Sequence, residues 1–178
     1  ILEIPGSLIV EKWGARRWIA RIMVTWGVVA ALTALVKTPH QFYAVRLLLG
    51  LAEAGFFPGI IVYLTHWFPA RDRARALSCL IIAQPAAQIF SLKITNAIMG
   101  MNALGLAGWQ WVYILWGIPA VLLGAAVWFL LTDRPEQAGW LTAEEKAALS
   151  TELAKEKAAR ESSSRLLSLG AALRNPKV

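Results

Sequence analysis

The 178 residues are 57% hydrophobic and only 16% charged, with a mean hydropathy of +0.53. The apolar residues form blocks of about 20, the length that crosses a hydrocarbon layer of ~30 Å as a helix, which excludes an ordinary soluble domain. The net charge of +7 comes from short stretches between these blocks and not from a basic face of a folded domain, so it does not indicate a nucleic-acid partner. The composition predicts an all-α, polytopic membrane protein.

Four apolar blocks follow one another along the chain, and we expect each to form a transmembrane helix. They cover residues 18–36, 42–67, 76–99 and 111–131. A shorter apolar stretch, residues 1–10, is typical of the end of a helix already under way. Because neither an initiator methionine nor a charged signal-peptide region precedes it, we expect a fragment that lacks its true N-terminus. Prolines inside the blocks, at Pro58, Pro85 and Pro119, predict kinks that neighbouring helices can accommodate.

Basic residues concentrate in alternate connections between the blocks. The first and third connections contain Lys12, Arg16, Arg17, Arg71, Arg73 and Arg75. The second and fourth, residues 37–41 and 100–110, contain one lysine and one histidine between them. Since basic loops stay on the inner side of a membrane, this alternation predicts a multi-pass protein of the inner (plasma) membrane. Its Arg-rich loops and C-terminal tail would be cytoplasmic.

Aromatic side chains gather near the block ends. The set consists of Trp18, Trp67, Trp109, Trp111 and Tyr113. Because such rings favour the membrane–water interface, we expect them to anchor the helices there, the alternative being ordinary apolar packing.

The composition changes after Leu131, where a polar segment begins. Thr142 followed by Glu145 fits a capping box, which predicts a helix from residue 143 to about residue 160. Its interleaved acidic and basic residues indicate a solvated face rather than a binding site. The three serines at residues 162–164 predict a flexible join, and a short amphipathic stretch follows.

Arg46 and Glu53 lie within an apolar block, where each ionisable side chain costs roughly 2.5–3.5 kcal/mol at a bilayer centre. Seven residues place them on one helix face about 10 Å apart, too far for a direct salt bridge in an unbent helix. A guanidinium fork suits a carboxylate ligand, and a buried carboxylate can exchange a proton near neutral pH. The pair predicts a site for proton-coupled transport of an acid. The alternative is that both residues are structural and are neutralised by charges on a helix outside this chain.

Other polar and small residues within the blocks have less specific meanings. Gln84 could donate to a substrate hydroxyl or to a carbonyl freed by Pro85, and these two readings stay open. Gly55 and Gly59, four residues apart, predict close packing of a neighbouring helix. Lys93 is expected to extend towards the outer surface.

The sequence contains no arrangement of residues that indicates catalysis. There is no Gly-rich phosphate loop, no metal-ligand cluster and no nucleophile–base set, so we expect no enzyme, no metal and no cofactor. The lone Cys79 indicates a buried, inert thiol.

Three longer stretches resemble a known transporter family. The loop between the second and third helices of major facilitator superfamily transporters is similar to EKWGARR, residues 11–17, with Glu11 in place of the usual aspartate. The fourth helix and following loop of the anion:cation symporter family are similar to RLLLGLAEAGFFPGIIVYLTHWFPARDRARA, residues 46–76. The sixth helix and central loop of that family are similar to GLAGWQWVYILWGIPAVLLG and LTDRPEQAGWLTAEEKAAL, residues 105–124 and 131–149.

This resemblance implies a partial major facilitator fold. Residues 1–131 would contain the end of the second helix to the sixth helix of the N-terminal bundle. Residues 132–178 would form the central cytoplasmic loop with a short amphipathic helix. The expected partners are the lipid bilayer, the missing first helix and the C-terminal half of the same chain, with no nucleic acid.

The resemblance also implies a function and roles for individual residues. The expected function is import of a small organic anion (a sugar acid, tartrate or a phthalate-like carboxylate) by proton symport with alternating access. Glu53 would couple transport to the proton, and Arg46 and Gln84 would bind the substrate. The implied gating network consists of Glu11, Arg16, Arg17, Arg71, Arg73 and Arg75. The alternatives are facilitated uniport, anion efflux and a membrane ligand sensor that does not transport.

Two residues depart from the family pattern. Trp116 stands where members often carry glutamate, and Lys93 stands where small residues are usual. Lys93 could attract anions, alter specificity or mark a decayed gene, and the sequence does not rank these readings.

Overall fold

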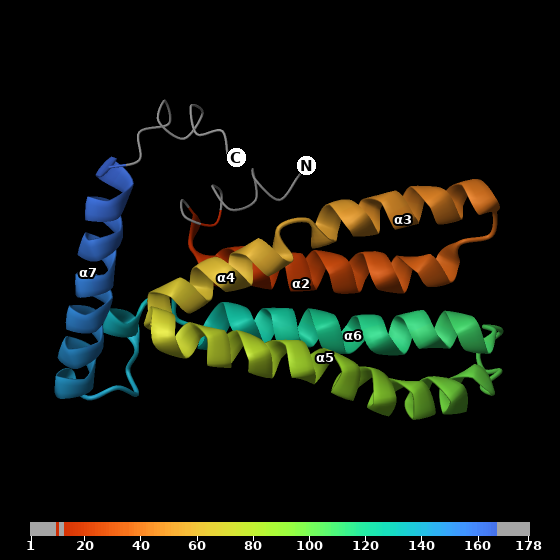
Figure 1. Cartoon of the computed structure of the whole chain (residues 1–178). Coiled ribbons are helices and arrows are strands. Elements are labelled where there is room, and N and C mark those ends of the chain that lie inside the picture. Colours follow the sequence, from red (N-terminus) through yellow and green to blue (C-terminus); the bar gives the residue numbers. More distant parts are fainter. Residues whose placement is uncertain (1–9, 11–12, 167–178) are drawn as a thin grey trace.

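The computed structural model describes residue 10 and residues 13–166 of the chain. Its elements are α2 (Ala15–Leu32), η1 (Thr33–Leu35), α3 (Pro39–Glu53), α4 (Phe56–Trp67), α5 (Ala70–Met99), α6 (Gly108–Leu130), η2 (Pro135–Gln137) and α7 (Ala143–Leu166). Four helical segments are long and apolar enough to cross a membrane: α2 with η1, α3 with α4, α5, and α6. They lie side by side, and α7 runs across one end of the bundle (Figure 1). The spans match the four apolar blocks in number and order, and no strand is present in the described part of the chain. The predicted all-α transmembrane bundle is therefore confirmed.

The most extensive helix pair in the described structure is α2 with α6. Gly27 and Gly117 face each other, and a Cβ atom added to either would lie 2.7 Å from the carbonyl oxygen of the other. Two turns further along α6, a Cβ atom on Gly124 would lie 2.9 Å from the backbone nitrogen of Val24. Only glycine leaves room for backbones this close, which is the packing that small residues permit between membrane helices.

Helices α3 and α4 form one crossing that is broken at Ala54 and Gly55. Pro58 explains the position of the break, because it has no N–H for the carbonyl of Ala54 and its ring clashes with that carbonyl. Gly55 takes a left-handed conformation, with φ of 85°, which glycine adopts without the cost of a Cβ clash. The predicted disturbance at Pro58 is thus found four residues earlier in the chain. Helices α5 and α6 continue through Pro85 and Pro119.

The buried core lies where α2 meets α4. It consists of Val10, Ala15, Trp18, Ile19 and Ile22, with Phe56, Ile60 and Tyr63 among the partly buried side chains packed on it. Trp18 is 7% exposed, and its indole Nε1 donates to the carbonyl of Gly55 at 3.2 Å. A Cβ atom on Gly59 would lie 3.1 Å from the same indole ring, so the predicted close packing at Gly59 is confirmed. The expectation that Trp18 is an interfacial anchor is wrong, because the packing of α2 on α4 encloses its ring.

Helix α5 is little covered by the rest of the described chain, and Ile98 is its one buried residue. Cys79 is consequently exposed. The prediction of a buried thiol is wrong, because an apolar block does not by itself show which of its faces another helix covers.

Helix α7 begins at the predicted capping box. The backbone N–H of Thr142 donates to a carboxylate oxygen of Glu145 at 2.9 Å, and the N–H of Glu145 donates to the Thr142 hydroxyl at 3.2 Å. The helix continues to Leu166, so the predicted end near residue 160 and the flexible join at residues 162–164 are both wrong. Serine is only mildly unfavourable in a helix, and no glycine or proline interrupts α7.

Candidate functional site

A cleft of about 660 Å³ opens beside the break between α3 and α4. Residues of α2, α3, α4, α5 and the break line it: Trp26, Gly50, Glu53, Ala54, Gly55, Phe56, Phe57, Pro58, Leu80, Ile81, Ala83 and Gln84. The break exists because of Pro58, so the same residue that interrupts the helix also shapes this cavity. A broken helix near the middle of a membrane crossing is the setting in which transporters place substrate and ion sites.

Glu53 and Gln84 are the two residues of this lining that can bear a charge or a side-chain amide. Glu53 is the last residue of α3, and Gln84 lies in α5 immediately before Pro85. The structure therefore brings together two of the three residues predicted to act on the substrate or the proton. The carboxylate of Glu53 is exposed and makes no hydrogen bond or ion pair within the described residues. The cleft thus presents one carboxylate and one amide in surroundings that are otherwise apolar and aromatic.

Arg46, the third predicted residue, does not line the cleft. Its Nη2 donates to the hydroxyl of Tyr113 on α6 at 3.0 Å, and its guanidinium carbon lies 5.0 Å from the centre of the Phe42 ring. No ion pair joins Arg46 to Glu53 in the described structure, in agreement with the separation expected from their spacing. The sequence had not indicated that Tyr113 contacts Arg46.

The unusual residue Trp116 has a polar partner on the neighbouring helix. Its indole Nε1 donates to the hydroxyl of Thr95 at 3.0 Å, which links α6 to α5. Lys93, two residues before Thr95, is exposed. Trp116 therefore helps to hold the two helices together in place of the acidic residue that the family pattern led us to expect.

The start of α2 is tied to the segment that follows α6. The backbone N–H of Arg16 donates to Asp133 Oδ1 at 2.7 Å, so a carboxylate lies at the positive end of the α2 dipole. Gly14 has φ of 86°, and a Cβ atom there would lie 2.8 Å from the other oxygen of Asp133. The sequence prediction missed Asp133, although an acidic residue directly after an apolar block could have indicated a helix-end partner.

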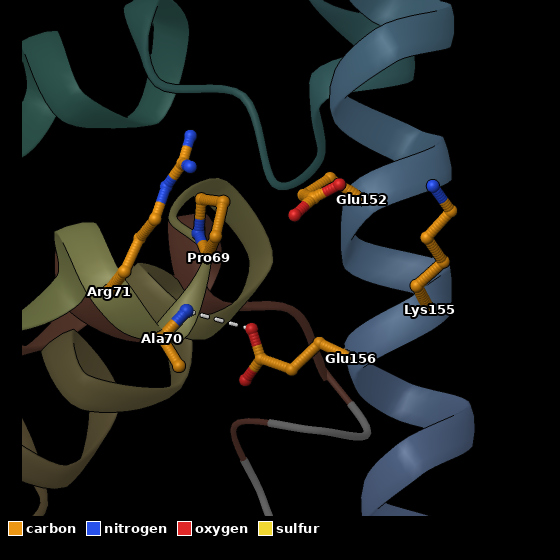
Figure 2. A pocket seen from close by; sticks show the side chains of 6 residues that line it. All are labelled: Pro69, Ala70, Arg71, Glu152, Lys155 and Glu156. Carbon is orange, nitrogen blue, oxygen red and sulfur yellow. Dashed lines mark hydrogen bonds between the residues drawn. The ribbon is translucent and has the colours of Figure 1, made fainter.

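A second carboxylate lies at the start of α5. Glu156 of α7 accepts a hydrogen bond from the backbone N–H of Ala70 at 2.8 Å, as Figure 2 shows. It also pairs with Arg73 at 3.1 Å, and these two side chains are only 24% and 19% exposed. Glu156 lines a small cavity of about 340 Å³ between α7 and the start of α5, and Glu152, one turn earlier on α7, lines it too. The predicted gating residue Arg73 therefore has its acidic partner within this chain.

The other predicted gating residues have weaker positions or lie outside the description. Arg71 pairs with its neighbour Asp72 at 3.2 Å, but the side chains are 79% and 51% exposed, and such surface pairs contribute about 0–1 kcal/mol. Arg17 and Arg75 are exposed and form no ion pair among the described residues. Glu11 lies outside the described residues.

The end of α4 also contacts the segment after α6. The Trp67 and Trp140 rings are stacked, with centroids 5.6 Å apart and planes inclined by 7°. The indole Nε1 of Trp67 donates to the carbonyl of Thr132 at 3.2 Å. The segment after α6 and helix α7 therefore contact the ends of α2, α4 and α5.

Four helical segments able to span a membrane, with a cleft beside a broken crossing, are features of a membrane transporter. The chain matches the Major Facilitator Superfamily over residues 1–177, and it belongs to that superfamily. It is therefore a multi-pass membrane protein of a transporter superfamily and not an enzyme.

The chain is similar to three curated transporters, each from a different bacterium. A protein of Agrobacterium vitis named "Putative tartrate transporter" is 49% identical over 97% of this chain and 40% of its own length. The "Putative metabolite transport protein NicT" of Pseudomonas putida is 45% identical over 86% of this chain and 36% of its own length. The "Quinolone resistance transporter" of Acinetobacter baumannii is 39% identical over 89% of this chain and 37% of its own length. The chain thus spans 40% or less of the length of these relatives.

Proposed function

We propose that the complete protein imports a small organic anion together with a proton, by alternating access. The observation that carries this proposal is the cleft beside the α3–α4 break, where Glu53 and Gln84 are the polar groups of an otherwise apolar lining. Superfamily membership and the relative named for tartrate support the same reading. The substrate class is a sugar acid, tartrate or a phthalate-like carboxylate.

Glu53 is the proton-coupling residue in this proposal. Two unit negative charges about 5 Å apart repel by about 3 kcal/mol at an effective dielectric constant of about 20. A carboxylate substrate therefore binds near Glu53 far better when that side chain carries a proton. Protonation also removes the cost of carrying a lone charge through a closed, dry state.

Gln84 and Arg46 have separate tasks in binding the substrate. Gln84 donates from its amide to a substrate oxygen inside the cleft. Arg46 supplies the positive charge that attracts the anion, from a position about 10 Å along α3 from Glu53.

We propose that the Arg-rich loops and residues 132–178 lie on the cytoplasmic side of the inner membrane, as the positive-inside pattern predicts. On that side Asp133 lies at the start of α2 and Glu156 at the start of α5. We propose that these carboxylates join the gating charges at Arg16, Arg17, Arg71, Arg73, Arg75 and Glu11. The network would hold the inner ends of the helices together when the protein is open to the outside.

The test uses the full-length protein in proteoliposomes with labelled tartrate, galactonate, glucarate and phthalate, with and without an inward proton gradient. We expect one acid to accumulate only under the gradient. Glu53→Gln should abolish accumulation while exchange of internal for external acid continues, because glutamine resembles the protonated carboxyl and still allows the acid to bind, but it neither takes up nor releases a proton. Glu144→Gln makes the same chemical change on exposed α7 and should leave accumulation intact. Accumulation by Glu53→Gln at the wild-type level would rule out its coupling role.

Export is the second candidate function. It is favoured by the aromatic side chains of the cleft, among them Trp26, Phe56 and Phe57, and by the relative named for quinolone resistance. A flat aromatic anion would pack well against such rings. Vesicles preloaded with a quinolone distinguish the two directions: proton-driven release without gradient-driven acid uptake would establish export.

A further inference from the structure

The guanidinium of Arg46 is held from two sides, and one of its contacts lies on a different helix. Tyr113 of α6 accepts a hydrogen bond from Nη2 at 3.0 Å, while the Phe42 ring, one turn earlier on α3, lies 5.0 Å from the guanidinium carbon. Tyr113 is itself fixed by an edge-to-face contact with Trp109, with ring centroids 6.3 Å apart and planes at 82°. A side chain that rotates freely elsewhere is therefore oriented here before any ligand arrives.

We propose that Tyr113 is a positioning residue for Arg46, and that the two side chains form one anion-binding site separate from the cleft. This inference rests on the proposed function, because it assumes that the anion meets Arg46. The class of ligand is a small organic carboxylate.

The donor chemistry of the pair is suited to a carboxylate. A guanidinium has five N–H groups, and the bond to Tyr113 uses one of the two on Nη2. One edge with two parallel N–H groups therefore remains for bidentate binding of a carboxylate. The Tyr113 hydroxyl accepts from Arg46, and this bond fixes the direction in which the free edge of the guanidinium points. A fixed fork loses less rotational freedom on binding than a mobile one, so its pre-orientation increases affinity.

The separation along α3 indicates why this site is distinct from the cleft. Arg46 and Glu53 are seven residues apart, or about 10 Å at 1.5 Å per residue. Arg46 is also not among the residues that line the cleft, whereas Glu53 is, so the two positions are separate. The anion would bind first at Arg46 and Tyr113 and then move to Glu53 and Gln84. Loss of the first site should therefore weaken apparent affinity without affecting proton coupling.

The experiment compares Tyr113→Phe with wild type in the full-length protein, using labelled tartrate. Phenylalanine keeps the ring and removes only the hydroxyl. We expect KM to rise about tenfold, the usual effect of losing a hydrogen bond to a charged group, while the accumulation ratio at saturating tartrate is unchanged. The matched control is Tyr43→Phe, since Tyr43 lies on α3, is 69% exposed and makes no hydroxyl hydrogen bond within the described residues.

A double variant separates a positioning role from a general structural one. If Tyr113 acts through Arg46, Tyr113→Phe should change KM less than twofold in an Arg46→Gln background. A KM within twofold of wild type for Tyr113→Phe alone would overturn the inference, as would an equal effect in both backgrounds. If Tyr113→Phe cannot be recovered folded, Arg46→Lys keeps the charge but lacks the fork. A rise in its KM supports the site, and a wild-type KM overturns it.

Binding to the solubilised protein keeps this inference distinguishable from the transport proposal. Tartrate that binds to wild type and binds about tenfold more weakly to Tyr113→Phe supports the site even if no proton-driven uptake is found. If wild type shows proton-driven uptake of tartrate, and wild type and Tyr113→Phe bind tartrate equally well, the transport proposal stands and the role of Tyr113 is refuted. If wild type binds none of tartrate, galactonate and phthalate, both proposals are wrong.

Discussion

Replacing Gly117 by alanine is expected to push α2 and α6 apart. The added Cβ atom would lie 2.7 Å from the carbonyl oxygen of Gly27, whereas ordinary contacts begin at 3.4 Å, so the backbones must separate by about 0.7 Å. Overpacking of this kind costs about 1–3 kcal/mol, of which the better helix propensity of alanine offsets about 0.5–1 kcal/mol. The net expectation is a loss of stability of about 0–2.5 kcal/mol, with a central value of about 1 kcal/mol.

The assay is thermal unfolding of the full-length protein in detergent. Gly50→Ala is the control, since a Cβ atom on Gly50 meets nothing within 4 Å and the change should be neutral or slightly stabilising. The double variant Gly27→Ala/Gly117→Ala should lose less stability than the sum of the single losses, because the first alanine already separates the helices. Equal unfolding midpoints for Gly117→Ala and Gly50→Ala would refute the reasoning.

Two further predictions concern α7. Glu156→Ala removes the acceptor of the Ala70 N–H, so amide exchange at the start of α5 should become about tenfold faster. Glu152→Ala is the control and should change this exchange rate little. Equal exchange rates in the two variants would contradict the prediction. Hydrogen bonds from the backbone and hydroxyl of Thr142 lower the pKa of Glu145, so its stabilisation of α7 is complete above the ordinary carboxyl pKa and is lost as pH falls through the lowered value. Protection from exchange at the start of α7 should decrease on acidification and become less pH-dependent in Glu145→Gln; constant protection in the wild type would count against the capping role.

The membrane spans could be predicted because hydropathy is a local property. Twenty apolar residues in a row must avoid water whatever their neighbours are, so the four blocks were found in the right number and order. The capping box of α7 is local in the same sense, since Thr142 and Glu145 are three residues apart. The break before Pro58 also follows from local chemistry, although its position four residues earlier requires the geometry of the helix.

The candidate site could be predicted only residue by residue. Arg46 and Glu53 were recognisable because a charge in an apolar block is costly, but the cleft shared by Glu53 and Gln84 depends on how the broken crossing meets α5. Tyr113 is 67 residues from Arg46, and nothing in its neighbourhood indicates that contact.

The glycines show why the contact surface could not be inferred from spacing. Gly55 and Gly59 have the spacing typical of close helix packing, yet a close approach of two backbones is found at Gly27 and Gly117, on two different blocks. Gly117 and Gly124 are seven residues apart and lie on one face of α6, a pattern that could have been noticed. The partner helix on that face still depends on the tertiary arrangement.

The attachment of α7 has a mechanical consequence. Asp133 is bonded to the start of α2, Trp140 is stacked on the end of α4, and Glu156 is bonded to the start of α5. Because it contacts three helices at three points, the segment from Asp133 to Glu156 is attached to the bundle along its length and not only through its covalent link to α6. A force applied near Leu166 would tilt α7 about its contact at Glu156. Such a tilt would be transmitted to the ends of α2, α4 and α5, the same helices that border the cleft.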